Sequence, residues 1–213
     1  MANHVYFHID VDVREDEFNN AFKSEEVETQ WGKRIDFLSM EHQPFYSHVD
    51  KTFDEDGWLE GSFDWYCNHV GAKWIDVEEA QDGFVYGHSA WSPPIAFVEN
   101  LVHYLSNKID NEVNATMTYE DEFRNFVGKV YVQSYYHDGD VDEEKWYAVA
   151  GDPIETDGDE LMEQMLNDYP FLRKEYEGDD FDWFELYKDK ESDEKICPSE
   201  LMDDYVHNFM ENN

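Results

Sequence analysis

The segment from His4 to Val13, HVYFHIDVDV, decides the fold of this 213-residue chain. Valine, phenylalanine and isoleucine occupy every second position from Val5 onward, and histidine, tyrosine and aspartate occupy the positions between them. A period of two residues is typical of a β-strand that buries one face. The segment therefore predicts a half-buried strand that turns Val5, Phe7 and Ile9 toward the core.

A second segment, Ile95–Ile109, repeats its apolar residues every three or four positions. This spacing places them on one side of a helix, so an amphipathic α-helix is predicted here. Pro93 and Pro94 come directly before it. A proline stops the preceding strand, and Pro94 suits the start of the helix.

The rest of the chain supplies further elements of both kinds. Helical spacing and capping residues predict helices over 15–24, over 63–74 with Gly71 closing it, over about 158–168, and over 199–211 with Ser199 as N-cap. Alternation predicts strands over 74–78, 83–90, 112–119 and 126–136, whereas 41–60 has an irregular pattern. The order is typical of an α+β, ferredoxin-like domain, an antiparallel sheet with helices on one face.

The net charge is the outlying property of the composition. The chain holds 52 Asp and Glu against 15 Lys and Arg, a formal net charge of −37. Self-repulsion on this scale opposes folding, so the charge calls for a separate explanation. Adaptation to salt, multivalent cation sites and competition with nucleic acid each account for it. Direct binding to nucleic acid or to an anionic membrane is disfavoured, because those partners attract basic patches.

The charge is densest after residue 137. Residues 138–213 carry 26 Asp and Glu and 6 Lys and Arg, which is more than half of the net charge. They also hold many large apolar residues, too many for a solvated acidic tail. We therefore predict a ferredoxin-like domain over 1–137 and an acidic, partly helical C-terminal extension over 138–213 that packs on it.

Cysteine usage and the N-terminus bear on location. Cys67 and Cys197 are the only cysteines, and they lie far apart in the chain, which fits a reducing compartment. The N-terminus lacks a basic stretch followed by an apolar one, and no apolar run is long enough to span a membrane. The expectation is a cytoplasmic protein, in the cytoplasm of a host cell.

Two motifs resemble those of a known family. Residues 68–74, NHVGAKW, and residues 89–94, SAWSPP, resemble the Asn-Trp-Gly-Thr-Lys-Trp run and the Trp-Ser-Pro-Pro turn of the YubB-type ferredoxin-like domain family of uncharacterised phage and plasmid proteins. Residues 126–128, FVG, are similar to the opening of that family's last strand. The resemblance covers about 1–137. It implies the ferredoxin-like fold and an origin in a mobile element, and it implies no catalytic residues.

Other candidate sites each have an ordinary surface explanation. His4, His8, Asp10 and Asp12 would share a strand face that His88 could join from a neighbouring strand, as in a transition-metal site. The solvent-facing side of a half-buried strand explains the same residues, and we favour that explanation. The acidic run 138–144 lacks the glycine and glutamate positions of a calcium loop. No catalytic motif occurs, and a nucleophilic Cys67 beside His69 lacks a partner. We expect no enzyme activity, no cofactor and no metal.

Three tyrosines form a further candidate group. Tyr6, Tyr131 and Tyr135 would lie on the sheet face opposite the helices. Tyrosines in that place can stack on bases, but the charge of this chain opposes nucleic acid. We expect them either to be buried under the C-terminal segment or to contact a protein partner.

The acidic residues are the strongest functional signal. Folded proteins with carboxylates spaced like DNA phosphates occupy basic clefts of DNA-binding proteins. The hypothesis is a phage-encoded DNA mimic that inhibits a host DNA-binding protein, such as a restriction or other defence nuclease, a recombination enzyme or the transcription machinery. The alternative is a salt-adapted or cation-binding accessory protein of a phage. The oligomeric state stays open, with a homodimer as one option. The candidate mimic residues are Asp138, Asp140, Asp142, Glu143, Glu144, Asp157, Asp159, Glu160, Glu163, Asp179, Asp180, Asp182 and Glu185.

Overall fold

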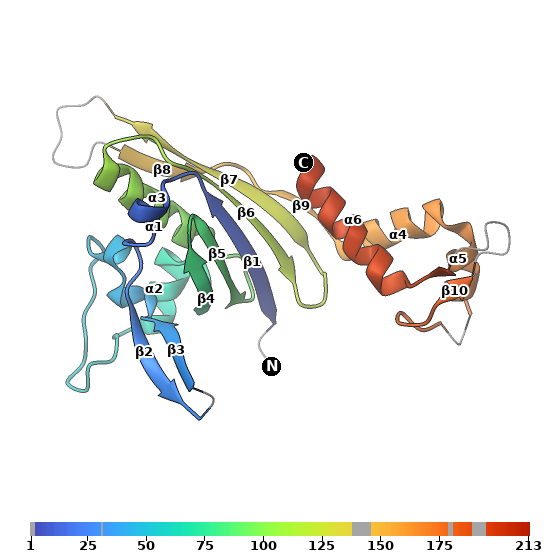
Figure 1. Ribbon diagram of the computed structural model, residues 1–213, viewed down its shortest axis with the longest axis horizontal. Coiled ribbons are helices and arrows are strands. Elements are labelled where there is room, and N and C mark those ends of the chain that lie inside the picture. The colour runs from blue at the N-terminus through green and yellow to red at the C-terminus, as the bar shows by residue number, and fades with distance from the viewer. Residues whose placement is uncertain (1–2, 31, 138–145, 179–180, 189–194) are drawn as a thin grey trace. The chain divides into compact units, whose positions relative to one another are not determined.

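The first strand, β1 (His4–Val11), lies inside the main sheet of the computed structural model (Figure 1). The structure describes residues 3–30, 32–137, 146–178, 181–188 and 195–213. The chain divides into two units. The sheet unit is Met1–Phe123 with Lys129–Pro153, and the helical unit is Arg124–Gly128 with Ile154–Asn213.

The main sheet has the strand order β4-β5-β1-β6-β7-β8, and β9 pairs with β7. The pairs β1–β5, β1–β6, β4–β5 and β7–β8 are antiparallel. The α+β class with a mostly antiparallel sheet is therefore confirmed, and the predicted strands near residues 4, 113 and 126 share one sheet. The remaining strands span β4 Ile75–Gln81, β5 Phe84–Ala90, β6 Asn114–Asp121, β7 Val127–Tyr136, β8 Trp146–Ala150 and β9 Ile154–Thr156.

The predicted boundary after residue 137 differs from the division between the units. Strand β8 belongs to the sheet unit, because the sheet unit extends to Pro153. The first residues of β7 belong to the helical unit instead. Contacts therefore divide the chain at other places than charge density does.

Helix α3 spans Ile95–Ile109, as its apolar spacing predicts. It packs on the face of the sheet that carries Val5, Phe7 and Ile9, with the rings of Phe97 and Phe7 6.2 Å apart. Phe97 is completely buried. Burial of one such side chain contributes about 2–3 kcal/mol of hydrophobic stabilisation, so this contact anchors the core of the sheet unit.

The helix predicted over 15–24 is wrong in its length. Helix α1 spans only Glu15–Phe18, and strand β2 (Ser24–Thr29) begins where the helix was expected to end. The apolar residues were spaced for another reason. Phe22 lies beyond the helix, and its ring contacts the ring of Phe45 at 5.3 Å. The apolar residues that follow the short helix thus pack into the core from a bend in the chain.

Strand β2 forms a hairpin with β3 (Gly32–Phe37), which the sequence pattern did not predict. Most of its side chains are exposed, so no alternation of apolar residues marks it. The hairpin carries two ion pairs instead. The side chain of Lys33 bonds Glu26 across the strands, and within β3 Arg34 Nε lies 2.6 Å from Asp36 Oδ1.

The segment after β3 is irregular, as predicted. It contains two short 3-10 helices, η1 (Met40–His42) and η2 (Pro44–Tyr46), and then helix α2 (Ser62–His69). Gly71 follows α2 with φ +89°, a left-handed conformation that favours glycine. The prediction that Gly71 closes this helix is supported by that geometry.

Gly87 in β5 shows how closely the strands approach. A Cβ atom at this position would lie 2.1 Å from the backbone oxygen of Asp76 and 2.9 Å from the ring of Phe7. No side chain fits there without moving the backbone of β4. Glycine is therefore required where β4 and β5 meet above Phe7.

Strand β8 is an edge strand whose outer backbone groups are bound by α3. Asn107 donates from Nδ2 to the oxygen of Trp146 at 2.7 Å and accepts from the nitrogen of Trp146 at 3.1 Å. The carboxylate of Glu99 accepts from the nitrogen of Ala150 at 2.8 Å. Two side chains of one helix thus replace a neighbouring strand at this edge.

The helical unit has a separate core. Its helices are α4 (Gly158–Asp168), α5 (Pro170–Tyr176) and α6 (Pro198–Asn212), with a short pairing of β10 (Tyr187–Lys188) and β11 (Lys195–Ile196). The predicted helices after residue 157 and near residue 199 are confirmed. The buried residues of this core are Val127, Leu161, Met165, Leu166, Leu172, Ile196, Met202 and Val206.

The predicted N-cap of the last helix is wrong. Helix α6 begins at Pro198, and Cys197 is its N-cap, without a hydrogen bond from its side chain. Proline suits the first helical position, because its missing N–H would have no partner there and its φ is already helical. Ser199 consequently lies inside the first turn.

Candidate functional site

Four of the predicted mimic acids lie at the start of α4. Asp157 is the N-cap of this helix, and its Oδ1 accepts a hydrogen bond of 2.7 Å from the nitrogen of Glu160. Glu160 in turn accepts a hydrogen bond of 2.9 Å from the hydroxyl of Thr156. Asp159 is exposed in the first turn, where the helix dipole favours an acid. Part of this cluster therefore stabilises the helix.

Glu163 is paired with a base. Its Oε2 accepts a hydrogen bond of 2.8 Å from Nη2 of Arg173 in α5. The hydrogen bond to Glu163 raises the pKa of Arg173 above its ordinary value. The charge of Glu163 is thus balanced locally, which the sequence did not reveal.

Asp182 and Glu185 lie on either side of an exposed aromatic ring. Asp182 Oδ1 accepts a hydrogen bond of 2.9 Å from the nitrogen of Phe184, so it shapes the turn. Phe184 is 80% exposed, and Glu185 is exposed beside it. Both acids and the ring between them are therefore exposed.

The other predicted mimic acids lie outside the described residues. They are Asp138, Asp140, Asp142, Glu143, Glu144, Asp179 and Asp180.

The acids of the helical unit share one property. Every one that the structure describes is exposed, while one set of apolar residues of α4, α5 and α6 is buried in the core of the unit. The predicted list missed several acids of this surface. Their positions in the helices identify them as exposed only once the buried side of each helix is known. The additional ones are Glu155, Asp168, Glu175, Glu177, Glu200, Asp203, Asp204 and Glu211.

A different surface lies on the main sheet, on the side opposite α3. We call it the open face. Cross-strand register aligns its side chains in rows: Tyr6 of β1 pairs with His88 and with Glu120, and His8 pairs with Tyr86. His8 is exposed, and Tyr6 is half-buried. Alternation along each strand could have assigned these side chains to one face in advance. It could not have shown which strands lie side by side.

The histidines of the open face lie near one another without forming a ligand set. The rings of His4 and His88 are 5.0 Å apart, and each lies 5.4 Å from Trp74. His88 Nδ1 lies 3.0 Å from a carboxylate oxygen of Glu78, whereas His8 lies 3.3 Å from Asp10. Over the part of the chain that the structure describes, no group of three or more His, Cys, Asp or Glu side chains could hold a metal ion.

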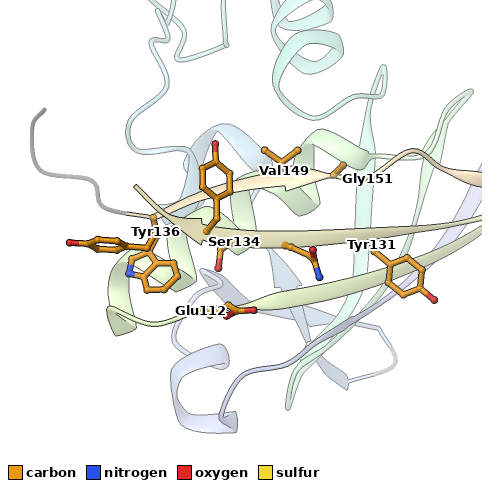
Figure 2. Close-up of a pocket in the computed structure, with 10 residues that line it drawn as sticks. Glu112, Tyr131, Ser134, Tyr136, Val149 and Gly151 are labelled. Carbon is orange, nitrogen blue, oxygen red and sulfur yellow. The ribbon is translucent and has the colours of Figure 1, made fainter. Parts of the chain in front are cut away.

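Two hollows open on this side of β7. The larger, about 540 Å³, is lined by Glu112, Tyr131, Gln133 and Tyr135 among others, and Figure 2 shows Tyr131 and Tyr136 at its two ends. The smaller, about 260 Å³, is lined by Asp10, Asp12 and Thr116, and it shares Tyr131 and Gln133 with the larger one. Tyr131 and Tyr135 are 42% and 49% exposed. Their burial under the C-terminal segment stays a prediction.

The two segments that resemble the YubB-type family contact each other. The hydroxyl of Ser92 donates a hydrogen bond of 2.7 Å to the oxygen of Gly71, and Lys73 Nζ lies 4.5 Å from the centre of the Trp91 ring. The backbone of Gly71 also approaches the first turn of α3. These residues therefore join α2, β5 and α3, a structural role for both motifs.

Cys67 is exposed in α2, near the helix end that contains His69. The oxygen of His69 accepts hydrogen bonds from the hydroxyl of Tyr46 at 3.0 Å and from Asn100 at 3.1 Å. The backbone of His69 thus fixes α2 to its neighbours.

Comparison with known proteins adds no relative. No family model, no curated protein and no solved structure matches this chain. Among the described residues, no helix is both long and apolar enough to cross a membrane.

Proposed function

We propose that the protein binds a basic DNA-binding protein in the place of DNA, through the carboxylates of its helical unit together with the other predicted mimic acids. One observation carries the proposal: all described acids of the helical unit are exposed on a folded body with its own apolar core. A disordered acidic tail would lose conformational entropy on binding, whereas a folded surface presents its charges at fixed spacing.

The electrostatics favour a basic partner. Duplex DNA carries one negative charge per roughly 1.7 Å of its axis, and a cleft built for DNA attracts any surface of comparable charge density. A formal net charge of −37 supports such an attraction. The partner class is a host nuclease of defence or restriction, a recombination enzyme or a transcription protein, and the proposed result of binding is inhibition.

We also propose the ferredoxin-like topology for the sheet unit and membership of the YubB-type family. The order β4-β5-β1-β6 supports the topology, with α2 between β1 and β4 in the chain and α3 between β5 and β6. This is the strand order of a split βαβ sandwich, which β7 and β8 extend. The contact between the two family-like motifs supports the membership.

The test begins with capture of partners from host lysate, with and without competing duplex DNA. The affinity for the captured partner is then measured over a range of salt concentrations for wild type and for a variant with Glu175→Lys, Glu177→Lys and Asp204→Lys. These three acids are exposed, and the first two lie near the C-terminal end of α5, where lysine is favourable. The variant should fold normally and bind far more weakly, mainly through slower association.

The matched control carries Glu25→Lys, Glu28→Lys and Glu55→Lys, three exposed acids of the sheet unit. It changes the net charge by the same amount, so an equal loss of affinity would contradict binding through the helical unit. A partner that binds this protein and DNA at the same time, with unchanged affinities, would contradict the proposal of mimicry. A salt-adapted or cation-binding accessory protein predicts another pattern: stability that rises steeply with salt, and no partner that duplex DNA displaces.

A further inference from the structure

We infer that the open face of the sheet unit is a second docking surface, which takes arginine side chains from an extended basic segment of a protein partner. The surface consists of the two hollows on either side of Tyr131 and the aromatic and acidic side chains beside them. It belongs entirely to the sheet unit and involves none of the predicted mimic acids, so the inference does not rest on mimicry.

Each hollow combines a carboxylate with the same tyrosine. Glu112 lines the larger hollow, and Asp10 and Asp12 line the smaller one. Asp10 is well exposed, with 73% of its side chain accessible. Because both hollows share Tyr131 and Gln133, two cationic side chains of one segment can enter them with the tyrosine between them.

Arginine matches this combination better than lysine does. Its planar guanidinium stacks on aromatic rings and donates in a fork to a carboxylate, while lysine offers a compact, strongly hydrated charge. The Tyr131 ring already has a cation near it, since Lys129 Nζ lies 5.1 Å from the centre of the ring. That contact shows that the ring accepts a positive charge from its own strand, and an incoming arginine uses the same property.

The negative charge of the chain disfavours two other possible occupants of this face. A second copy of this chain would place another net charge of −37 against it, and a nucleic acid would bring phosphates. Both are repelled within the screening length of about 10 Å at 0.1 M salt. A basic segment is the occupant that the charge favours.

The experiment separates this site from the general attraction of an acidic protein for cations. Short peptides of equal charge, one rich in arginine and one rich in lysine, are titrated into the full-length protein by calorimetry. Three uncharged substitutions are compared: Tyr131→Leu, Tyr131→Phe and, as the control, Phe184→Leu. Phe184 is exposed in the helical unit, so its loss removes a ring without changing the charge.

The expected result has three parts. The arginine peptide binds more tightly than the lysine peptide; Tyr131→Leu weakens the arginine peptide about fivefold; and Tyr131→Phe and Phe184→Leu leave it unchanged. Hydrogen exchange should show protection in β1, β6 and β7. Equal binding of both peptides, or equal losses for Tyr131→Leu and Phe184→Leu, overturns the inference. So does self-association or binding of a single-stranded oligonucleotide that Tyr131→Leu abolishes.

Discussion

The sheet unit and the helical unit bury different kinds of side chain. The sheet unit encloses aromatic rings, with Phe7, Phe18, Phe45 and Phe97 almost inaccessible. The helical unit buries mainly aliphatic residues, and its aromatic residues, such as Trp183, are only partly covered. A small body buries a smaller share of its surface. The helical unit therefore has less hydrophobic stabilisation in reserve, and the loss of a helix cap should matter more to it than to the sheet unit.

The largest effect should come from the core of the sheet unit. Phe97→Ala removes a fully buried ring that contacts Phe7 and Phe45, and it should destabilise the sheet unit by about 3–5 kcal/mol. Chemical denaturation followed by circular dichroism measures the loss. If the helical unit is an independent body, its own transition keeps its midpoint. A shift of both transitions together would show that the two units unfold as one.

The next effect concerns the outer edge of the sheet. Asn107→Ala removes both hydrogen bonds to the backbone of Trp146 and should cost about 2 kcal/mol. The loss should be local, with faster hydrogen exchange of the Trp146 amide and unchanged exchange in β1. Uniformly faster exchange throughout the sheet would contradict a role confined to β8.

Alkaline pH should weaken the sheet unit through Tyr66. Burial raises the pKa of Tyr66 well above its ordinary value, and the hydrogen bond of 2.7 Å to Glu41 acts in the same direction. The folded state therefore keeps this proton at a pH where the unfolded chain releases it. The resulting stability is complete below about pH 10 and is lost as the pH rises further. Tyr66→Phe should cost about 1 kcal/mol at neutral pH and flatten this decline in denaturation curves. An unchanged slope would exclude Tyr66 as its source.

A smaller effect is expected in the helical unit. Asp157→Ala removes the N-cap hydrogen bond of α4 and should lower the stability of this unit by about 1 kcal/mol. Asp157→Asn retains an acceptor and should recover most of the loss. Thermal unfolding checks both variants, and equal losses would mean that charge, not capping, is what α4 needs at this position.

The smallest effect should follow from Glu163→Gln, which weakens the ion pair with Arg173. Exposed ion pairs contribute little to stability, so the unfolding midpoint should move hardly beyond experimental error. Repeating the measurement at high salt supplies the control, because screening should remove whatever difference exists. A large loss would show that α4 and α5 depend on this pair.

The sequence predicted elements whose periodicity comes from a buried face. β1 and α3 are of this kind, since each turns one regular set of apolar residues to the core. The β2–β3 hairpin was not predicted, because its strands are largely exposed and are joined by charged pairs such as Lys33 with Glu26. Strand β8 was not predicted either, because its partners on one side are the side chains of Asn107 and Glu99, which no local pattern reveals.

The candidate site divides in the same way. Composition identified the acidic surface, but it could not separate Asp157, which caps a helix, from Asp159, which projects beside it. Alternation placed Tyr131 and Tyr135 on one face, and only strand pairing showed that β1 and β6 line the hollow beside Tyr131. Roles that depend on contacts between distant segments were beyond any reading of one chain.

The binding of β8 by α3 also has a consequence for assembly. A sheet grows into a fibril or a runaway polymer by recruiting strands at an edge with unpaired amides and carbonyls. Asn107 and Glu99 already hold the groups that a recruited strand would need at Trp146 and Ala150. Growth at that end of the sheet would first have to displace a folded helix. The β8 edge of an aromatic-rich chain is thereby protected against strand recruitment by geometry, a safeguard that remains when salt screens the charge.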